Sequence, residues 1–385
     1  MGNTETRYQP GQVRDAILQA LSSAPRALSV KEIQDKVRQA IGDTPSSSIR
    51  SYLRLNTPTL FTRESRGCYR LQDVETTAVR AEAFRARISR GPVRIGAAKL
   101  YHADCFDWLA EQPNNTIHAV VTDPPYGLHE YSKDQQSKLR TGKGGVWRIP
   151  PSYDGHVRSP LPRFTTLTSA QLDDLHAFFH AWGRLLLRKL VPGAHVVVAS
   201  NPLVSYIVAA ALALAGLERR GEIIRLVMTM RGGDRPKGAH EQFPEVSVMP
   251  RSMWEPWLVY RKPFEDRVQD NLRSWGTGGF RRPCEERPFG DVIQSSPTRK
   301  EERALAAHPS LKPQAFLRQI VRGVLPLGRG VVLDPFAGAG STLAAAEAVG
   351  YESIGVEQDK TYFEMACEAI PKLKTLRCRA GNHAK

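Results

Sequence analysis

The sequence of 385 residues has few cysteines, no long apolar stretch and too few acidic residues to balance its basic ones. Its five cysteines are odd in number and form no Cys-x-x-Cys pair, which argues against a disulfide framework and a cysteine zinc site. We therefore expect a reducing, cytoplasmic location. The longest apolar run, residues 207–217, is too short to cross a bilayer, so we expect no membrane partner.

Lysine and arginine outnumber aspartate and glutamate by 54 to 39, which gives a formal net charge of +15. An excess of this size favours a polyanionic partner, most simply nucleic acid, although a solvated basic surface would have the same composition. The hydrophobic content of 41% is ordinary for a globular protein, and the chain length predicts two domains.

Residues 1–75 have the pattern of a small helical unit followed by a hairpin. Apolar residues recur at helical spacing, and two short strand-like runs then flank a Ser-Arg-Gly turn. The predicted helices cover residues 12–23, 29–42 and 46–56, and the predicted hairpin covers residues 60–72. This order of elements resembles the winged helix-turn-helix modules attached to bacterial DNA-modifying enzymes.

The resemblance implies a DNA-facing surface on the third helix and on the wing of this unit. The candidate DNA-binding residues there are Arg50, Arg54, Arg63 and Arg66. A protein-docking module would use the same fold, so the alternative stays open. Residues 76–97 are arginine-rich without a sustained apolar face, which indicates a basic linker, and residues 371–385 form a basic tail.

Between residues 98 and 370 strand-like and helix-like segments alternate along the chain. Alternation of this kind predicts an α/β domain with a mostly parallel sheet covered by helices on both faces. Three longer segments interrupt it, at residues 128–165, 231–250 and 263–306. Connections of this length in a compact domain are usually functional or disordered.

A glycine loop follows one predicted buried strand, in the stretch VVLDPFAGAGSTLAAA at residues 331–346. Gly338 and Gly340 allow a ligand to approach the backbone closely, and a helix starts directly after them. The loop fits neither the dinucleotide fingerprint nor the Walker loop. About 17 residues beyond Gly340 the next strand ends at Glu357, well placed for two ribose hydroxyls. The pattern suits a nucleoside without a phosphate chain, and a plain strand-to-helix turn is the alternative.

Asp-Pro-Phe-x-Gly-x-Gly followed by a strand-terminal acid resembles the S-adenosylmethionine site of DNA amino-methyltransferases. The stretch ADCFDWL (103–109) resembles that family's adenine-binding strand end, with alanine in place of the usual glycine, and HPSLKP (308–313) resembles its His-Pro-x-x-Lys-Pro segment. The cofactor-binding residues that the resemblance implies are Asp104, Cys105, Phe106, Asp123, His308, Lys312, Asp334, Pro335, Phe336, Ala337, Gly338, Gly340, Ser341, Thr342, Glu357 and Gln358.

The stretch VVTDPPYGLHE (120–130) ends a predicted buried strand with Asp-Pro-Pro-Tyr, the catalytic signature of methyltransferases that act on exocyclic amino groups. The carboxylate of Asp123 can accept one amine hydrogen and the carbonyl of Pro124 the other, so that the nitrogen lone pair is directed at the methyl group. Pro124 and Pro125 restrict the backbone, and Tyr126 offers a stacking face to a base rotated out of the duplex. No metal is required.

The catalytic stretch precedes the cofactor loop, an order that resembles the β group of DNA amino-methyltransferases over about residues 98–370. The resemblance implies a Rossmann-like class I methyltransferase sheet in circularly permuted order, behind a small N-terminal winged-helix domain. We expect a site-specific enzyme, nucleoid-associated, that methylates adenine N6 in double-stranded DNA. Cytosine N4 is the first alternative, followed by RNA or protein amide nitrogen and a non-catalytic DNA-binding regulator. A cognate restriction endonuclease and a homodimer stay open as partners.

Recognition of DNA is assigned to two inserts. By elimination, residues 263–306 are the candidate target-recognition region, with Arg273, Arg281 and Arg282 as candidates for guanine contacts, and ordinary packing is the alternative. Residues 128–165 are expected to close over the rotated base, with a solvated loop as the alternative. The phosphate-contacting candidates in this insert are Lys133, Lys138, Arg140 and Lys143.

Overall fold

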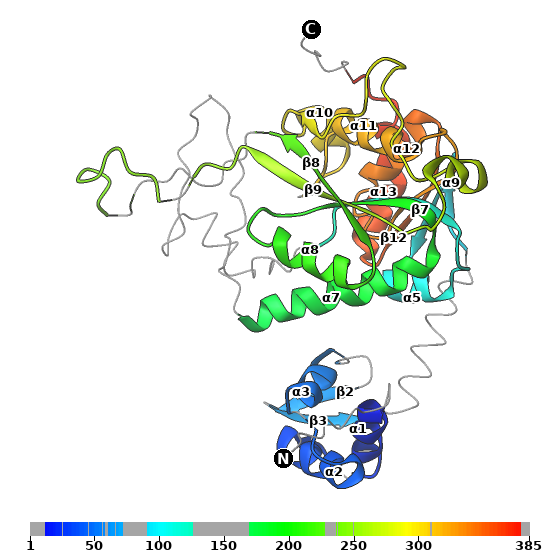
Figure 1. The fold of residues 1–385 in the computed structure, drawn as a ribbon. Coiled ribbons are helices and arrows are strands. Elements are labelled where there is room, and N and C mark those ends of the chain that lie inside the picture. The colour runs from blue at the N-terminus through cyan, green and yellow to red at the C-terminus, as the bar shows by residue number, and fades with distance from the viewer. Residues whose placement is uncertain are drawn as a thin grey trace. The chain divides into compact units, whose positions relative to one another are not determined.

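The chain divides into two compact units, residues 1–90 and 91–385, each with its own core (Figure 1). The computed structural model describes most of both units. Its described residues are 12–24, 26–44, 46–55, 57, 61–65, 67–71, 91–125, 169–227, 236, 238–248, 250–308 and 310–378. No helix within these ranges is long and apolar enough to cross a membrane.

The N-terminal unit contains the predicted helices and hairpin, with one additional short strand. Its helices are α1 (Gln12–Ser22), α2 (Val30–Ile41) and α3 (Ser46–Leu55), and its strands are β1 (Leu28–Ser29), β2 (Phe61–Ser65) and β3 (Cys68–Leu71). The strands form an antiparallel sheet in the order β1-β3-β2. The short β1 was not predicted, because two residues are too few for a periodicity to show. Assignment of the unit to the winged-helix class stays a prediction.

Helix α2 shows how local sequence sets the bounds of an element in this unit. Ser29 accepts a hydrogen bond from the amide of Glu32, and the Glu32 carboxylate accepts one from the amide of Ser29. This reciprocal cap satisfies two amides that the first turn leaves without helical partners. Ile33 and Val37, one turn apart, are fully buried in the core of the unit.

The larger unit is built on a sheet of nine strands in the order β10-β8-β9-β7-β6-β11-β12-β5-β4. The strands are β4 (Val93–Ile95), β5 (Ala98–His102), β6 (Ile117–Thr122), β7 (Leu190–Ala199), β8 (Glu218–Leu226), β9 (Trp254–Arg261), β10 (Val292–Gln294), β11 (Val331–Asp334) and β12 (Glu352–Glu357). The helices are α5 (Cys105–Glu111), α7 (Ser169–Lys189), α8 (Ser205–Leu214), α9 (Val268–Trp275), α10 (Lys300–Leu305), α11 (Gln314–Val324), α12 (Ser341–Val349) and α13 (Lys360–Leu373).

The sheet is mostly parallel, as predicted. Only β4 and β9 run antiparallel to their neighbours. Strand β11 lies between β6 and β12 at the centre, although it follows β6 by more than 200 residues in the chain. The carboxyl ends of β5, β12, β11 and β6 therefore meet at one edge of the sheet, although these strands are far apart in the chain.

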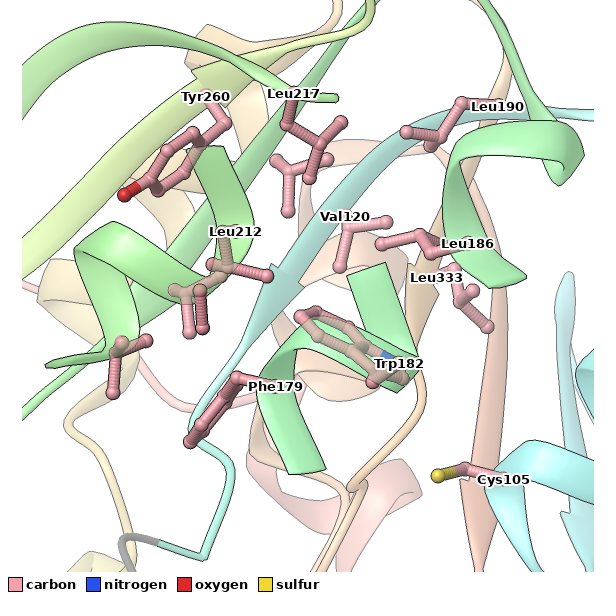
Figure 2. Close-up of a cluster of buried hydrophobic side chains, with 14 of the residues drawn as sticks. Cys105, Val120, Phe179, Trp182, Leu186, Leu190, Leu212, Leu217, Tyr260 and Leu333 are labelled. Atoms are coloured by element: carbon pink, nitrogen blue, oxygen red, sulfur yellow. The ribbon is translucent and has the colours of Figure 1, made fainter. Parts of the chain in front are cut away.

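Helices cover both faces of this sheet, because the side chains of each central strand alternate between them. Val120 of β6 packs in the core beneath α7 and α8, together with Trp182 and Leu212, as Figure 2 shows. Val121, one residue later, packs in the core beneath α11, together with Phe316. In Figure 1 α7 and α8 lie on one face of the sheet and α11 lies on the other.

Three features of the larger unit differ from the sequence-based expectations. Strand β4 lies within residues 76–97, the segment expected as a linker, and pairs with β5. The sheet therefore begins earlier in the chain than predicted. Helix α13 ends at Leu373, beyond the expected boundary at residue 370. The segment 263–306 is not a plain loop, because it contains α9, β10 and α10. Each is short or polar, so it leaves little periodicity in the sequence.

Helix α12 is bounded by two glycines with the same backbone conformation but different surroundings. Gly340 at its start has φ 78° and Gly350 at its end has φ 79°. A Cβ atom on Gly340 would lie 2.5 Å from Cγ1 of the buried Ile370, whereas one on Gly350 would meet nothing within 4 Å. Only the first glycine is therefore required by packing as well as by the backbone.

Gly340→Ala should lower the free energy of unfolding by about 2 kcal/mol more than Gly350→Ala. Both changes carry the same left-handed backbone penalty of about 1 kcal/mol, so their difference isolates the contact with α13. Urea unfolding followed by tryptophan fluorescence measures both values. Equal losses in the two variants would contradict the packing role of Gly340.

Candidate active site

Two neighbouring strand ends are joined by a buried hydrogen bond at the centre of the sheet. The hydroxyl of Thr122, the last residue of β6, donates to Oδ1 of Asp334, the last residue of β11, at 2.7 Å. Both side chains are buried. Asp123 follows Thr122 directly, so this bond fixes where the Asp-Pro-Pro turn leaves the sheet relative to the glycine loop.

Asp334 also organises the start of the glycine loop. Its Oδ1 accepts a hydrogen bond from the amide of Phe336 at 3.2 Å, and the side chain of Thr342 is a further partner. Burial raises the pKa of Asp334 to about 6, although these hydrogen bonds act in the opposite direction. The residue therefore lies beneath the loop and holds it, rather than facing solvent from it.

The glycine loop approaches the His-Pro-x-x-Lys-Pro segment closely. A Cβ atom on Gly338, whose φ is 49°, would lie 3.0 Å from Nε2 of His308. The His308 ring packs edge-on against Tyr362, with 4.4 Å between centroids, and burial lowers the pKa of the imidazole. The two motifs are thus neighbours in space, as the sequence resemblance implies, and His308 acts as a wall of the site.

Two further carboxylates stand at the ends of β12 and β5. Glu357 accepts hydrogen bonds from the amides of Gly338 and Asp359, each at 2.8 Å, and burial raises the pKa of Glu357. Asp104 caps α5 by accepting from the amides of Phe106 at 2.8 Å and Asp107 at 3.3 Å. Because β5 pairs with β12 in parallel, both acids lie at the edge that holds Asp334.

An aromatic cluster adjoins these carboxylates, and half of it comes from α7. Phe106 contacts Phe178 with 5.3 Å between ring centroids, and Phe336 contacts Phe178 at 6.0 Å and Trp182 at 5.7 Å. The sequence pointed to Phe106 and Phe336 but missed the two α7 residues. Phe178 and Trp182 stand four residues apart on a helix, a spacing that marks a shared face without showing what the face covers.

The catalytic candidate Asp123 belongs to a chain of charges. Nζ of Lys312 lies 2.5 Å from Oδ2 of Asp123 and 3.1 Å from Oε1 of Glu255, and Glu255 pairs with Nη1 of Arg225 at 2.7 Å. Lys312 was predicted as a cofactor-binding residue, and the structure places its ammonium on the carboxylate of Asp123. Glu255 and Arg225 were missed, because a lone acid and a lone arginine in two predicted strands carry no local signal.

These side chains surround a small pocket at the carboxyl edge of the sheet. Its lining residues are Asp123, Trp257, His308, Ser310, Lys312, Leu317, Asp334, Phe336, Ala337, Gly338, Ala339, Ser341 and Thr342. Nine of the predicted site residues are among them, drawn from three motifs that are far apart in the sequence. The pocket is therefore the candidate active site.

Other predicted site residues lie at its border or elsewhere. Pro124 is buried, Pro125 is exposed, and the carbonyl of Gln358 accepts from His102. Cys105 packs in the core below the pocket, where burial raises the pKa of its thiol. Pro335 completes the turn after Asp334. The described residues do not include Arg66, Tyr126, Lys133, Lys138, Arg140 or Lys143, nor the side chain of Arg54.

The three arginines predicted to read guanine lie away from this pocket. Arg281 donates to the hydroxyl of Tyr351 at 2.8 Å, at the amino end of β12, and Arg273 pairs with Asp270 at 2.6 Å. Arg282 donates to the carbonyl of Glu285. Asp123 stands at the opposite edge of the sheet from Tyr351, and guanine contact by the three arginines stays a prediction.

The model of one protein family, described as DNA methylase, matches residues 117–368. This chain belongs to that family. The match covers more than half of the sequence and contains the Asp-Pro-Pro turn, the charge chain and the glycine loop. DNA methylases of this family use S-adenosylmethionine, the cofactor that the sequence resemblance implies.

Individual relatives are distant from this DNA methylase. The type II methyltransferase M2.DpnII of Streptococcus pneumoniae is 23% identical over 69% of this chain and 87% of its own length. M.HindIII of Haemophilus influenzae is 21% identical over 70% and 94%. Among solved structures, the M1.HpyAVI–SAM complex has a TM-score of 0.44 at 21% identity, and the match covers 72% of this chain and 100% of that one. The cytosine-N4-specific PvuII DNA methyltransferase has 0.47 at 13%, covering 76% and 91%. The family assignment rests on the family model alone.

Asp334→Asn should remove a pH dependence of stability. A carboxyl whose pKa is about 6 in the fold and near 3.8 when unfolded stabilises the fold fully below pH 3.8, and this stability is lost as the pH rises to about 6. Relative to the asparagine variant, the wild type should therefore lose about 3 kcal/mol between about pH 3 and pH 7 and then level off. Urea unfolding across this range measures the difference, and a constant difference would contradict the raised pKa.

Proposed function

We propose that this DNA methylase transfers a methyl group from S-adenosylmethionine to adenine N6 at a specific sequence in duplex DNA. The observation that carries the proposal is the position of Asp123. Its carboxylate follows the end of β6, lines the pocket under the glycine loop, and is held by the ammonium of Lys312.

The residues around the pocket fit the adenosyl part of such a cofactor. Carboxylates at the ends of β5 and β12, Asp104 and Glu357, can accept hydrogen bonds from an amine and from ribose hydroxyls. The glycine loop lacks the dinucleotide fingerprint, so the site favours a nucleoside. Gly338 has no Cβ, and one placed there would crowd His308, so the loop suits close backbone contact with a ligand. The bound cofactor supplies a methyl group that is already activated by its positive sulfur.

Asp123 and Pro124 prepare the acceptor. The lone pair of an exocyclic amine is delocalised into the base, which makes the nitrogen a poor nucleophile. A carboxylate and a backbone carbonyl that each accept one N–H favour a pyramidal nitrogen and direct its lone pair out of the ring plane. Pro125 restricts the backbone that carries the Pro124 carbonyl. Lys312 donates a hydrogen bond to Oδ2 of Asp123, which fixes the carboxylate where the amine would be received.

Adenine is favoured as the target base by the Asp-Pro-Pro-Tyr sequence, since Ser-Pro-Pro-Tyr leans towards cytosine. Cytosine N4 is the second candidate, because the same pair of acceptors would hold either amine. In both cases the base has to leave the duplex to reach a pocket at the edge of the sheet. Stacking of that base on Tyr126 remains part of the proposal.

The N-terminal unit is proposed to add contacts to the DNA backbone. Arg50 on α3 and Arg63 on β2 are both exposed, and Arg63 already lies along the hairpin, where its Nε donates to the carbonyl of Ser65 at 3.3 Å. Exposed arginines on a helix and an adjacent hairpin can reach phosphates without selecting a base.

Transfer of a tritiated methyl group from S-adenosylmethionine should label duplex DNA, but not RNA or protein. After digestion of the labelled DNA to nucleosides and chromatography, the label should co-elute with N6-methyl-2′-deoxyadenosine. Label in N4-methylcytosine would instead select the second candidate, and no label in any of the three substrates would defeat the proposal.

Asp123→Asn should reduce methyl transfer at least about 100-fold, because the amide is a weaker acceptor and directs its NH2 group at either Lys312 or the incoming amine. The affinity for S-adenosylmethionine, measured by calorimetry, should change by less than about threefold, since the variant keeps the size of the side chain. Loss of cofactor binding with the loss of transfer would contradict the role assigned to Asp123.

A further inference from the structure

Four charged side chains of alternating sign run from Asp123 into the protein, through Lys312 and Glu255 to Arg225. The three N–O distances along this chain are 2.5, 3.1 and 2.7 Å. The four side chains are only 7–16% exposed, so water screens little of their interaction. Two positive and two negative groups together leave no net charge inside the fold.

The inner end of this chain is fixed by the sheet. Arg225 and Glu255 are direct partners in the antiparallel pairing of β8 with β9. Arg225 also donates from Nε to the hydroxyl of Ser295 at 3.0 Å and from Nη2 to the carbonyl of Ser296 at 3.1 Å, and its guanidinium lies 5.1 Å from the ring centre of Phe316. Glu255 thus has a rigid base, whereas the lysine stem between Glu255 and Asp123 is flexible.

Lys312 needs both carboxylates to stay charged where it is. Burial alone would lower the pKa of Lys312, but Asp123 and then Glu255 outweigh burial and raise it. Burial likewise opposes the ionised form of Glu255, and Lys312 followed by Arg225 overcomes it, so the pKa of Glu255 is lowered. Of the other titratable groups facing this chain, His308 neighbours Lys312 and Asp334 neighbours Asp123.

We infer that Glu255, anchored by Arg225, is a positioning residue for the proposed methyl transfer: it holds the Lys312 ammonium on Oδ2 of Asp123 and thereby fixes the carboxylate that receives the target amine. Glu255 touches neither base nor cofactor in this role. The inference rests on the proposed function for its effect on catalysis, while the coupling between Glu255 and Asp123 belongs to the fold itself.

The chain contains a matched control for Glu255. Glu218 and Arg261 are also direct partners in the pairing of β8 with β9, and their Oε2 and Nη2 atoms lie 2.7 Å apart. This second Glu–Arg pair stands at the other end of the same two strands, away from Asp123. Glu255→Gln and Glu218→Gln therefore remove the same charge from the same ladder, and only the first change reaches the pocket.

Glu255→Gln should lower kcat by about 10- to 100-fold while KM for DNA and for S-adenosylmethionine stays within about threefold of the wild type. Glu218→Gln should leave kcat and KM unchanged. In Glu255→Gln, Lys312 loses one of the two carboxylates that raise its pKa. The decline of kcat at alkaline pH should therefore begin about one pH unit lower in this variant than in the wild type. A fall of kcat by the same factor at every pH, or equal kcat values in the two variants, would overturn the inference.

Glu255→Asp provides a second variant that keeps the charge if Glu255→Gln does not fold. Its carboxylate is one methylene shorter, so kcat should be intermediate and the alkaline limb should match the wild type. The full wild-type kcat in Glu255→Asp would overturn the positioning role of Glu255, because the shorter side chain displaces the carboxylate.

A measurement without catalysis separates this inference from the proposed function. Urea unfolding of a double-mutant cycle tests the coupling of Asp123 to Glu255. The unfolding equilibrium constant of the double variant Asp123→Asn, Glu255→Gln should differ at least about threefold from the value that the two single variants predict, because both changes act through Lys312. The effects of Asp123→Asn and Glu218→Gln should add. If the wild type labels no DNA, the proposed function is wrong, but this cycle still shows whether Glu255 and Asp123 are coupled. Additive effects of Asp123→Asn and Glu255→Gln would overturn the inference.

Discussion

The parallel pairing of β6 with β11 is the contact on which the rest of the site depends. The registers Ala119–Val332 and Val120–Leu333 bring together two strand ends whose last residues are 212 positions apart in the chain. The buried Thr122–Asp334 hydrogen bond closes this pair at the edge. The Asp-Pro-Pro turn and the glycine loop then leave the sheet side by side, so that Asp123 and the glycine loop line one pocket.

Electrostatics divides the pocket into two parts. On the side of β11 and β12, the buried Asp334 and the half-buried Glu357 accept hydrogen bonds from backbone amides, and burial raises the pKa of both carboxyls. On the side of β6 and β9, Asp123 and Glu255 are paired with cations instead. Hydrogen bonds from amides hold a loop in shape, whereas an ion pair fixes the position of a carboxylate. The two parts of the pocket therefore perform different tasks with the same residue type.

Much of the fold followed from local patterns. The strand ending at Asp334, the capping box of α2 and the hairpin at residues 60–72 were predicted, because each depends on a short run of residues with a steric or hydrogen-bonding reason. The prediction was weakest for 263–306, where α9 and β10 are short and their partners lie elsewhere in the chain. Glu255 and Phe178 were missed for the same reason, since neither has a local feature that sets it apart.

The sequence by itself determined the chemistry of this DNA methylase. The residue types of the Asp-Pro-Pro turn and the glycine loop indicated an amino group as acceptor and a nucleoside as cofactor, because such chemistry needs those groups at close spacing. Only the tertiary structure decided which side chains support them. It joined Lys312 to Asp123 and Glu255 to Lys312, and it directed Arg281 to Tyr351 rather than to the pocket. The physical reason is that a buried charge is stabilised by whichever partner the fold brings within a few ångströms, and strand order in space sets that partner.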